Sequence, residues 1–547
     1  MATTQLEYRQ DDGAVSALSK NRPTLRLGVV GCGPRGMQAL EAISRQIDPG
    51  QQRRLDITVF EPSPKLGAGH IYNPDQPKQL RMNFATQYID FWKVAADQPT
   101  PVSGSLMGWL ERRYPDLAAS DHFIPRAVVG EYLHDCFDRV SERLRSVANL
   151  TIKPTRVRSI KSADGEWVVH DDSEIYHFDE VVLTTGHEGL RNSTDSQSLP
   201  RESFVFPVET NLSTEKIPSG SNVLVIGFGL TAIDAAIMLT EGRGGKFVNS
   251  SGIPTYIASN REPRRIEMRN RSGRPMLAKP TSQVEPIRND FWDVFLDRLK
   301  SCRPRHGELS FQKDVWPVIL DATAGLLQQS GRATSSADVD SWYRDWSRYK
   351  MDASSARSAL LQSFAVATGQ RPKDIPFALG EAWRKLYPEM VSLVSYGGLV
   401  DQQWPCFRRV SVEMERIAFG PPAESVGKLL RLIRNRMVTI GVCGAIEPKS
   451  HDNVISAVIA SPQQPASDGP VAELIRNGDL QIDTTTGGIL VSKSGHAIGG
   501  ARGLAVFGRA TEGWIVGNDT LSRTLHDQIE HWARTVAVAL CKSIHHQ

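Results

Sequence analysis

Two glycine-rich stretches have the residue spacing that binds the diphosphate of a dinucleotide. Each has three small residues in the pattern G-x-G-x-x-G/A, namely Gly31, Gly33 and Gly36 in the first and Gly227, Gly229 and Ala232 in the second. The first small residue allows a tight turn, the second lets the backbone approach a diphosphate, and the third lets a helix pack closely on a strand. Two such loops predict two bound dinucleotides, for which a flavin beside a nicotinamide is the usual combination.

The residues around the first loop favour FAD. Pro34 and Arg35 open the predicted helix, where proline is tolerated because its missing N–H would lack a partner anyway. Glu61 follows the next predicted strand, residues 55–60, and lies thirty residues after Gly31. A carboxylate at that position accepts hydrogen bonds from ribose hydroxyls and repels a 2′-phosphate, so FAD or NAD is expected there rather than NADP.

Further FAD contacts are expected where small or polar residues follow other predicted strands and loops. The candidates are Gly69, Met82, Asn83, Thr185, Gly186, Gly508, Thr511 and Asp519. Asp519 is equally suited to cap a helix predicted over residues 521–540. A shorter helix is predicted over residues 470–477, ended by Gly478. His187 directly follows Gly186 at the crossover to the second domain, and a structural role is favoured because a lone histidine is more often structural.

The second loop favours NADPH. Leu230 and Thr231 open its predicted helix, and the next predicted strand, residues 255–258, is followed by Ser259 and Arg261 instead of an acidic residue. Serine and arginine at such a strand end bind a 2′-phosphate well, because arginine offers a planar bidentate contact. We therefore predict NADPH rather than NADH at the second loop.

The order of these patterns predicts an α/β protein with two Rossmann-like dinucleotide-binding domains, for FAD and NADPH, and a largely helical insert. The predicted divisions are a disordered tail over 1–23, a FAD-binding domain over 24–215 and 466–547, an NAD(P)H-binding domain over 216–273 and 436–465, and a helical insert over 274–435. We expect the insert to cap the flavin and to supply substrate contacts.

The composition of the 547-residue chain narrows the class of protein. It is 40% hydrophobic and 23% charged, and its net charge of +3 argues against nucleic acid or an anionic membrane as a partner. No apolar run approaches the ~20 residues of a bilayer-spanning helix. The six cysteines contain no C-x-x-C pair, which argues against a dithiol flavoenzyme and a clustered metal site. We predict no metal and a reducing, cytoplasmic location.

Five motifs carry a resemblance to a known family: residues 31–36 (GCGPRG), 80–83 (LRMN), 125–133 (PRAVVGEYL), 179–186 (DEVVLTTG) and 507–513 (FGRATEG). They resemble the bacterial FAD/NAD(P)-binding proteins that are distantly related to the lysine and ornithine N-hydroxylases. The resemblance extends over about residues 24–540 and is weakest in the predicted insert. The Phe-x-Gly-x3-His-x3-aromatic fingerprint of Baeyer–Villiger and flavin-containing monooxygenases is absent from the sequence, which disfavours ketone or sulfide oxygenation.

This resemblance implies a monooxygenase that uses FAD, NADPH and O2 to oxygenate the nitrogen of an amine or amino acid through a C4a-hydroperoxyflavin. Aspartate is one candidate, and its two carboxylates would need cations such as Arg81, Arg264, Arg265 or Arg269. No catalytic side chain is assigned, because the cofactors carry the chemistry. The alternative is an NAD(P)H-dependent flavin reductase or dehydrogenase that passes electrons to a partner or a small acceptor. A small-molecule substrate is expected, and a homo-oligomer is compatible with the sequence.

Overall fold

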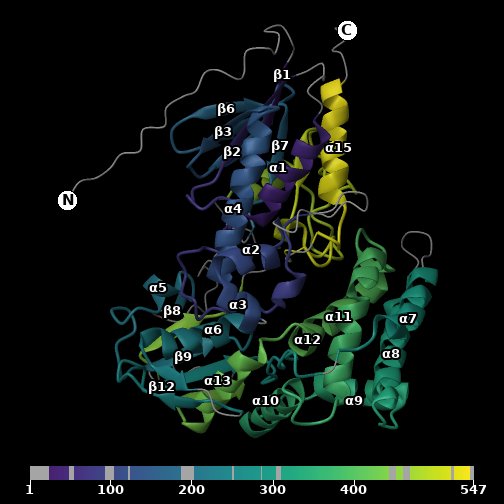
Figure 1. Ribbon diagram of the computed structural model, residues 1–547. Helices are drawn as coiled ribbons and strands as arrows, with labels where there is room; N and C mark the ends of the chain where they lie inside the picture. The colour runs from purple at the N-terminus through teal and green to yellow at the C-terminus, as the bar shows by residue number, and fades with distance from the viewer. Residues whose placement is uncertain are drawn as a thin grey trace.

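The computed structural model shows an elongated molecule (Figure 1). One domain, which holds the first and the last described residues, lies at one end, and a second domain and a helical bundle lie at the other. The structure describes residues 24–47, 54–92, 104–120, 123–186, 202–248, 252–284, 286–302, 309–442, 451–459, 469–518, 521 and 523–541. The predicted tail, His187 and Asp519 lie outside these residues. None of the described helices is both long and apolar enough to cross a membrane.

The first domain is built on five parallel strands in the order β15–β7–β1–β2–β3. These strands are β1 (Thr24–Val30), β2 (Arg54–Phe60), β3 (Asn149–Lys153), β7 (Glu180–Leu183) and β15 (Leu504–Val506). Successive side chains of β1 point to opposite faces, so Leu27 and Val29 enter one core and Val30 enters another. Both faces of the sheet are therefore buried, as expected for a parallel sheet.

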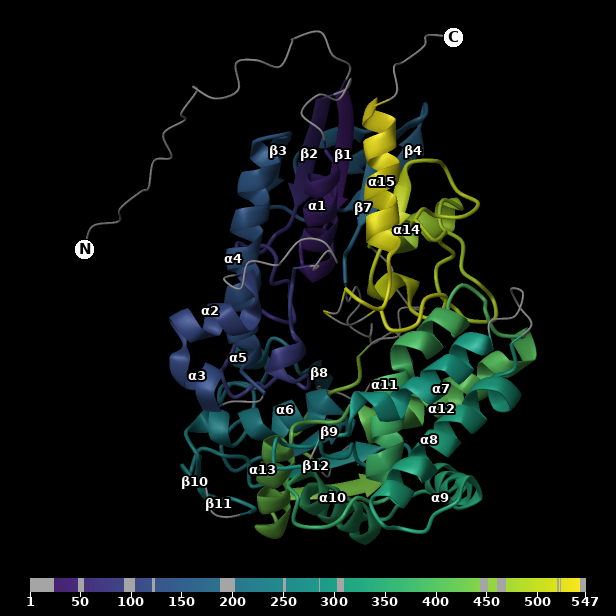
Figure 2. The ribbon, with the colours of Figure 1, turned by 45° about the vertical axis from the view of Figure 1, so that its right-hand side comes forward.

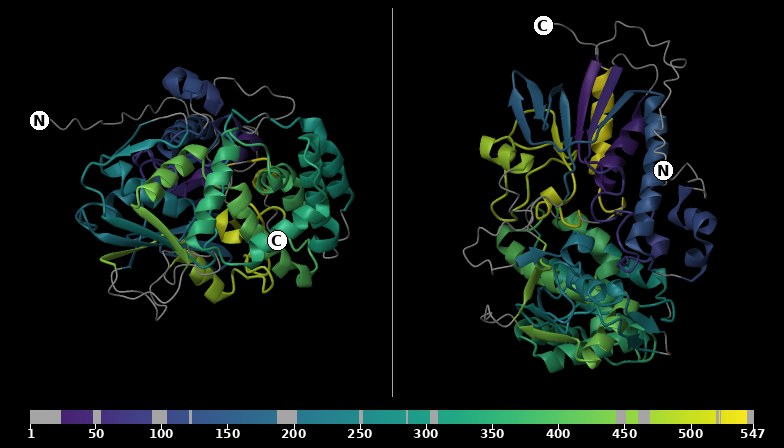
Figure 3. Two further views of the ribbon diagram at one scale, coloured as in Figure 1. Left: turned by 90° about the horizontal axis from the view of Figure 1, so that it is seen from below. Right: turned by 90° about the vertical axis from the view of Figure 1, so that its left-hand side faces the viewer.

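Helices cover one face of this sheet and a small antiparallel sheet covers the other. The helices are α1 (Pro34–Gln46), α4 (Arg126–Arg145) and α15 (Gln528–Cys541), and the second layer holds β4 (Ser159–Ala163), β5 (Glu166–His170), β6 (Ile175–Phe178) and α14 (Pro470–Asn477). The right-hand view of Figure 3 shows the two layers of strands beside one another. Two shorter helices, α2 (Leu106–Arg113) and α3 (Pro115–Ser120), precede α4 in the chain and lie at its lower end in Figure 1.

Two predicted helix ends in this domain have different outcomes. Gly478 ends α14 in the left-handed conformation, with φ 82°, as the sequence predicted. The last helix was predicted over residues 521–540, but α15 begins only at Gln528. The preceding described residues are irregular because Arg523 and His526 turn to contact the carbonyl oxygens of Phe91 and Val516.

The second domain also has a five-stranded parallel sheet, in the order β13–β12–β9–β14–β8. Its strands are β8 (Glu202–Phe204), β9 (Asn222–Ile226), β12 (Arg265–Asn270), β13 (Val438–Val442) and β14 (Asn453–Ser456). Helices α6 (Leu230–Met238), α10 (Ala353–Ala367) and α13 (Ala423–Arg434) share its core, and α5 (Val208–Asn211) lies beside it. The two parallel sheets and their covering helices confirm the predicted α/β fold with two Rossmann-like units.

The remaining helices form a separate bundle with its own core, centred on buried residues such as Phe311 and Trp383. They are α7 (Asn289–Ser301), α8 (Trp316–Gln329), α9 (Ser336–Arg348), α11 (Ile375–Val394) and α12 (Trp404–Ala418). Figure 2 shows the bundle beside the second sheet and below α14 and α15. Helices α10 and α13, although inside the predicted insert, pack on the second sheet instead of in this bundle.

Candidate functional site

Four strand ends of the first sheet bring the predicted FAD residues to one edge. Because β1, β2, β7 and β15 are parallel, their carboxyl ends meet there. The residues that follow the strands at this edge are Gly31, Glu61, Thr184 to Gly186, and Gly508. The structure therefore places the first glycine loop, the strand-end carboxylate and two other predicted segments together.

The glycines of the first loop occupy positions that a larger residue could not. A Cβ on Gly31, where φ is 91°, would lie 2.6 Å from the carbonyl oxygen of Thr184, and one on Gly36 would lie 2.3 Å from that of Gly31. Gly33 and Gly69 face each other across a similarly short gap, because a Cβ on Gly69 would lie 3.0 Å from the Cα of Gly33. Because these positions carry no side chain, a ligand can approach the loop backbone directly.

The first turn of α1 has no anionic or capping side chain of its own. Its N-cap residue, Gly33, makes no side-chain cap, Pro34 takes the first helical position, and the turn contains no acidic residue. The amides and the dipole of such a helix N-terminus attract a phosphate group. The loop therefore fits the diphosphate of a dinucleotide.

Glu61 lies directly beside this loop. Its Oε2 accepts a hydrogen bond from the N–H of Cys32 at 2.8 Å, and its Oε1 accepts one from the N–H of Ser63 at 2.9 Å. Burial raises the pKa of the Cys32 thiol, and the charge of Glu61 adds to that effect, so Cys32 stays a neutral packing residue. Glu61 is held in the position from which a carboxylate accepts ribose hydroxyls.

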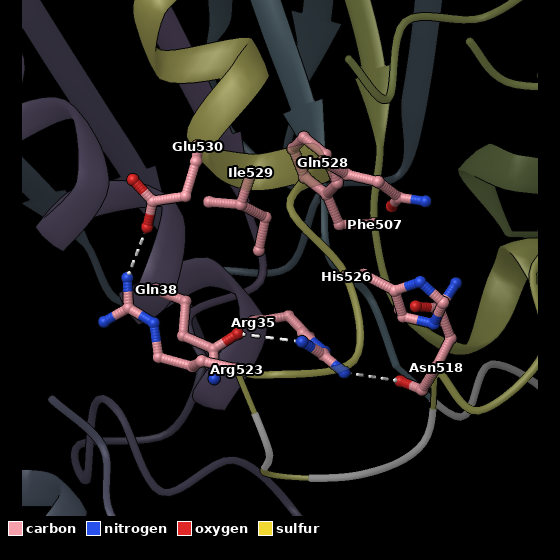
Figure 4. A pocket seen from close by; sticks show the side chains of 10 residues that line it. Arg35, Gln38, Phe507, Asn518, Arg523, His526, Gln528, Ile529 and Glu530 are labelled. Atoms are coloured by element: carbon pink, nitrogen blue, oxygen red, sulfur yellow. Dashed lines mark hydrogen bonds and ion pairs between the residues drawn. The ribbon is translucent and has the colours of Figure 1, made fainter. Parts of the chain in front are cut away.

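A small pocket lies between α1 and the C-terminal segment (Figure 4). Arg35 projects into it, where its guanidinium donates hydrogen bonds to Gln38 at 2.9 Å and to the carbonyl oxygen of Asn518 at 3.2 Å. Gly508 also lines the pocket, and a Cβ there would lie 3.2 Å from Cγ of Arg35. The pocket joins the first glycine loop to the segment that the sequence predicted as a further FAD contact.

His526 lines the same pocket and is neutral at ordinary pH. Burial lowers its pKa to about 4, and the positive charge of Arg35 acts in the same direction. Its Nε2 lies 2.8 Å from the carbonyl oxygen of Val516, which fixes Nε2 as the protonated nitrogen. The sequence analysis did not single out His526, because only the fold brings it beside α1.

A buried ion network supports the floor of this pocket. Arg523 donates to Glu41 of α1 at 2.7 Å and to Glu530 of α15 at 3.0 Å, and Arg45 also contacts Glu530, at 2.6 Å. Glu41, Arg523 and Glu530 are buried. The network fixes α15 against α1 across a sequence separation that no local pattern could have predicted.

The second glycine loop has the same construction as the first. Gly227, where φ is 129°, would place a Cβ 3.2 Å from the carbonyl oxygen of Ala457, and Gly229 is the N-cap of α6 without a side-chain cap. Leu230 and Thr231 form the first helical positions, with no acidic residue in the turn. The amides of α6 therefore offer a second phosphate site.

The strand beside this loop is not the one that the sequence predicted. Residues 255–257 form β11 (Thr255–Ile257), which pairs only with β10 (Lys246–Val248) in a separate hairpin. The neighbour of β9 is instead β12, and the N–H of Gly227 donates to the carbonyl oxygen of Arg269 at 2.7 Å. The end of β12, not of β11, therefore lies beside the second loop.

The predicted phosphate-binding residues consequently lie at the opposite edge of the second sheet. Arg265 is the first residue of β12 and pairs with Asn222, the first residue of β9, and the N–H of Arg264 donates to Ser221. Ser259 and Arg261 form the turn before them, where each donates a hydrogen bond to the carbonyl oxygen of Arg243. Ser259, Arg261, Arg264 and Arg265 are thus separated from Gly227 by the length of β9.

The residues at the carboxyl end of β12 have the side chains for a 2′-phosphate. Asn270 takes the register position opposite Gly227, as Glu61 does opposite Gly31. It is neutral, and its Oδ1 accepts hydrogen bonds from the N–H groups of Ser272 and Gly273. Arg271 is exposed, and no hydrogen bond or ion pair to it is found within the described segments. The sequence signal that could have indicated this site is the Arg271-Ser272 pair directly after residues 265–270.

The other predicted contact residues are placed as follows. Met82 is buried in the first core, and Thr511, also buried, donates to the carbonyl oxygen of Gly508 at 2.9 Å. The amide of Asn83 donates to the carbonyl oxygen of Phe419, at 3.3 Å. Arg81 lies 3.7 Å from Glu424 and is therefore near the second domain.

Two ion pairs bear on the contact between the domains and on the arginines available to a substrate. Arg126 of α4 forms a 2.7 Å ion pair with Asp234 of α6, and burial of both side chains makes this a tight contact between the two domains. Arg269 is paired with Glu267 at 2.9 Å and so is not available to a substrate in this structure. Within the described ranges no group of three or more His, Cys, Asp or Glu residues is arranged to hold a metal ion.

Comparisons with known proteins identify the proteins that this chain is similar to. Residues 28–188 match the model of a family described as FAD-NAD(P)-binding. The chain is 29% identical over 337 residues to an L-aspartate N-monooxygenase (nitrosuccinate-forming) of Streptomyces davaonensis, covering 53% of this chain and 50% of that protein. It is 27% identical over 316 residues to a nitrosuccinic acid synthase of Aspergillus oryzae, covering 54% and 48%. The chain thus spans about half the length of the curated relatives it matches.

Among the solved structures to which this chain is similar is the cyclohexanone monooxygenase from Rhodococcus sp. Phi1 bound to NADP+. It is 14% identical, with a TM-score of 0.42, over 95% of this chain and 85% of that one. The family match confirms the predicted resemblance to FAD/NAD(P)-binding proteins. The similarity to an N-monooxygenase confirms the predicted distant relation to N-oxygenating flavoenzymes.

Proposed function

We propose that this chain, whose residues 28–188 belong to the FAD-NAD(P)-binding family, is a FAD-dependent monooxygenase that uses NADPH and O2 to oxygenate an amino nitrogen. The observation that carries the proposal is the pair of glycine loops at the carboxyl edges of two parallel sheets, each opening a helix without a side-chain cap. Similarity to an L-aspartate N-monooxygenase supports aspartate as the first substrate to test.

FAD is assigned to the first sheet edge. The loop of Gly31, Gly33 and Gly36 would hold its diphosphate, and Glu61 would accept its ribose hydroxyls. Arg35, in the adjoining pocket, supplies a positive charge beside the diphosphate. On this assignment the FAD-binding domain comprises residues 24–215 and 466–547, except that β8 belongs to the second sheet.

NADPH is assigned to the second sheet edge. Gly227 and Gly229 would hold its diphosphate, and Arg271 with Ser272 would hold its 2′-phosphate. Asn270 supports this choice, because a neutral side chain at the strand end does not repel the phosphate as Glu61 would. NADPH rather than NADH is therefore the proposed electron donor.

A bound FAD would supply the redox chemistry, namely hydride acceptance from NADPH and activation of O2. The overall reaction consumes NADPH, a proton, O2 and the amine, and gives NADP+, water and the hydroxylamine. Two hydrogen bonds join the bundle to the chain beside the proposed FAD site: the N–H of Tyr396 donates to the carbonyl oxygen of Trp514 at 2.7 Å, and the N–H of Val516 donates to Ser395 at 3.2 Å. These bonds hold the end of α11 against the segment that lines the FAD pocket.

The decisive experiment follows the electrons and the oxygen in the same preparation. FAD-loaded protein is mixed with NADPH without oxygen, and the flavin absorbance is followed. Oxygen labelled with ¹⁸O and L-aspartate are then added, and the products are analysed by mass spectrometry. Bleaching of the flavin followed by ¹⁸O in an N-oxygenated product is the expected result.

The controls separate the proposed function from its alternative. Without an amine, a monooxygenase should oxidise NADPH slowly and release hydrogen peroxide, whereas a reductase should turn over only with an electron acceptor. If the flavin bleaches fast and an added acceptor is reduced rapidly, but neither aspartate nor another amine gives a labelled product, the protein is a flavin reductase instead of a monooxygenase. Failure of the protein to bind FAD would reject both.

A further inference from the structure

Lys279 is a buried lysine without a carboxylate partner. Lys279 is only 6% exposed, yet no carboxylate of the described residues lies within ion-pair distance of its ammonium. Its Nζ instead donates to the carbonyl oxygen of Asn83 and lies over the rings of Phe84 and Phe419, at 5.7 and 5.6 Å from their centres. Burying a charged group without a counter-ion is costly, so such a group is retained where it has a function.

The charged neighbours of Lys279 come from two helices of the bundle. Arg384 and Glu381 of α11 and Glu415 of α12 act on it through space, and Arg384 is itself bonded to Glu381 and to the carbonyl oxygen of Ala418. Burial and the charge of Arg384 lower the pKa of Lys279 to about 7, against the opposite effect of the two carboxylates. The amine thus changes its charge near neutral pH.

Lys279 also lies where the two nucleotide edges and the helical bundle meet. Phe419 beside it contacts the ring of Tyr387, whose hydroxyl would lie 3.1 Å from a Cβ on Gly517, the neighbour of Asn518 in the FAD pocket. On the other side Met276, three residues before Lys279, is the nearest side chain to Gly229 of the second loop. A substrate held at Lys279 would therefore lie between the two proposed cofactor sites.

We propose that Lys279 binds a carboxylate group of the substrate. The inference rests on the proposed function and identifies the substrate class as a carboxylate-bearing amine. Phe84, whose ring lies beside the ammonium, is 38% exposed, so Lys279 lies one side chain below the surface. A carboxylate arriving there favours the charged form of the amine, so Lys279 takes up a proton from solvent as the substrate binds. The bound pair is then a buried, charge-assisted hydrogen bond.

Lys428 offers a matched control. It is also a buried lysine beside an aromatic ring, with Phe247 at 5.5 Å, but it is paired with Glu241 and Glu424, each at 2.9 Å. Its charge is therefore already neutralised within the protein. Replacement of Lys428 tests the effect of losing a buried lysine, without removing the proposed carboxylate site.

The experiment measures binding of succinate, a dicarboxylate with no amine to oxygenate, to the FAD-loaded enzyme. Calorimetry at about pH 8 in two buffers of different ionisation enthalpy gives both the affinity and the protons taken up. We expect wild type to take up a proton on binding. We expect Lys279→Met to weaken binding at least about 30-fold and to abolish the uptake, and Lys428→Met to change neither. FAD content and thermal unfolding verify that each variant is folded.

Three results would overturn the inference: no succinate binding to wild type, binding without proton uptake, or equal affinity in folded Lys279→Met. The uptake by wild type needs no variant, so the test stands even if Lys279→Met fails to fold. Flavin bleaching by NADPH is read in the same preparations. If the flavin bleaches and product forms while Lys279 proves dispensable, only this inference is rejected. If succinate binding depends on Lys279 but the flavin does not bleach, only the proposed function is rejected.

Discussion

The two glycine loops share one sequence pattern but differ in the strand that lies beside them. In the first sheet the next strand along the chain, β2, is also the neighbour of β1, so Glu61 lies opposite Gly31. In the second sheet the hairpin of β10 and β11 intervenes, and β12 becomes the neighbour of β9. The residue opposite the loop is then Asn270. Sequence order therefore identifies the strand end beside a glycine loop only when no hairpin is inserted between the two strands.

The strand end also separates the two proposed ligands electrostatically. Glu61 is an anion beside the first loop, whereas Asn270 is neutral and is followed by Arg271. An anion at this position suits ribose hydroxyls, and a cation suits a 2′-phosphate. If this comparison is right, changes at one edge should alter FAD binding alone, and changes at the other should alter NADPH use alone.

The largest effect is expected from Gly36→Ala. The added Cβ would lie 2.3 Å from the carbonyl oxygen of Gly31 and 2.8 Å from Oγ1 of Thr184, so the loop could not keep its shape. We expect almost complete loss of FAD from the purified protein, measured as flavin absorbance per chain. The second loop already has Ala232 at the equivalent place, so Ala232→Gly should retain FAD and cost about 1 kcal/mol of helix stability or less. Full FAD content in Gly36→Ala would contradict the assigned loop.

The next largest effect is expected from Arg271→Ala. Removing a charged hydrogen-bond donor from a phosphate costs about 1.5–3 kcal/mol, so the KM for NADPH should rise about 10- to 100-fold. The KM for NADH, which lacks the phosphate, should hardly change. Steady-state oxidation of both nucleotides measures the two values.

Arg261→Ala is the control that sharpens this test. Arg261 lies at the opposite edge of the sheet and donates to the carbonyl oxygen of Arg243, so its loss should leave the KM for NADPH unchanged. A large rise in Arg261→Ala and none in Arg271→Ala would restore the site predicted from the sequence and reject the one inferred from β12.

The contrast between the loops also explains which parts of the molecule the sequence could predict. The first loop, Glu61 and the end of α14 at Gly478 depend on local patterns, and all of them were predicted. Residues 265–270 carry charges at alternating positions, so the sequence favours residues 255–258 as the central strand. In the structure Ile266 and Met268 face the core, while Glu267 on the other face is paired with Arg269 and His451. Such pairing across the chain is invisible in one sequence, as is the position of Lys279.

A moderate effect is expected from Glu61→Gln. The carboxylate now accepts from the N–H groups of Cys32 and Ser63 with separate oxygens, and an amide has only one oxygen to replace them. We expect FAD to bind about 10-fold more weakly, since a charged acceptor is lost while the loop glycines remain. Titration of FAD into the flavin-free protein gives the dissociation constant. An equal rise in the KM for NADPH would show that the two edges are not independent.

The smallest effect is expected from pH and comes from the first edge only. The folded protein holds the pKa of His526 at about 4, below its unfolded value near 6.5. The unfolded chain therefore binds this proton first, so the free energy of unfolding falls as pH is lowered from about 6.5 towards 4, by at most about 1.4 kcal/mol per pH unit. Denaturant unfolding of the flavin-free protein at several pH values measures the slope.

His526→Gln separates this contribution from that of the carboxylates, which also begin to titrate at low pH. Glutamine can still donate to the carbonyl oxygen of Val516 but does not take up a proton. The variant should therefore lose less stability than wild type between about pH 6.5 and pH 5, with the two slopes equal above about pH 7. Identical slopes across the whole range would mean that His526 is not held neutral, and that the pocket beside Arg35 is wetter than the structure indicates.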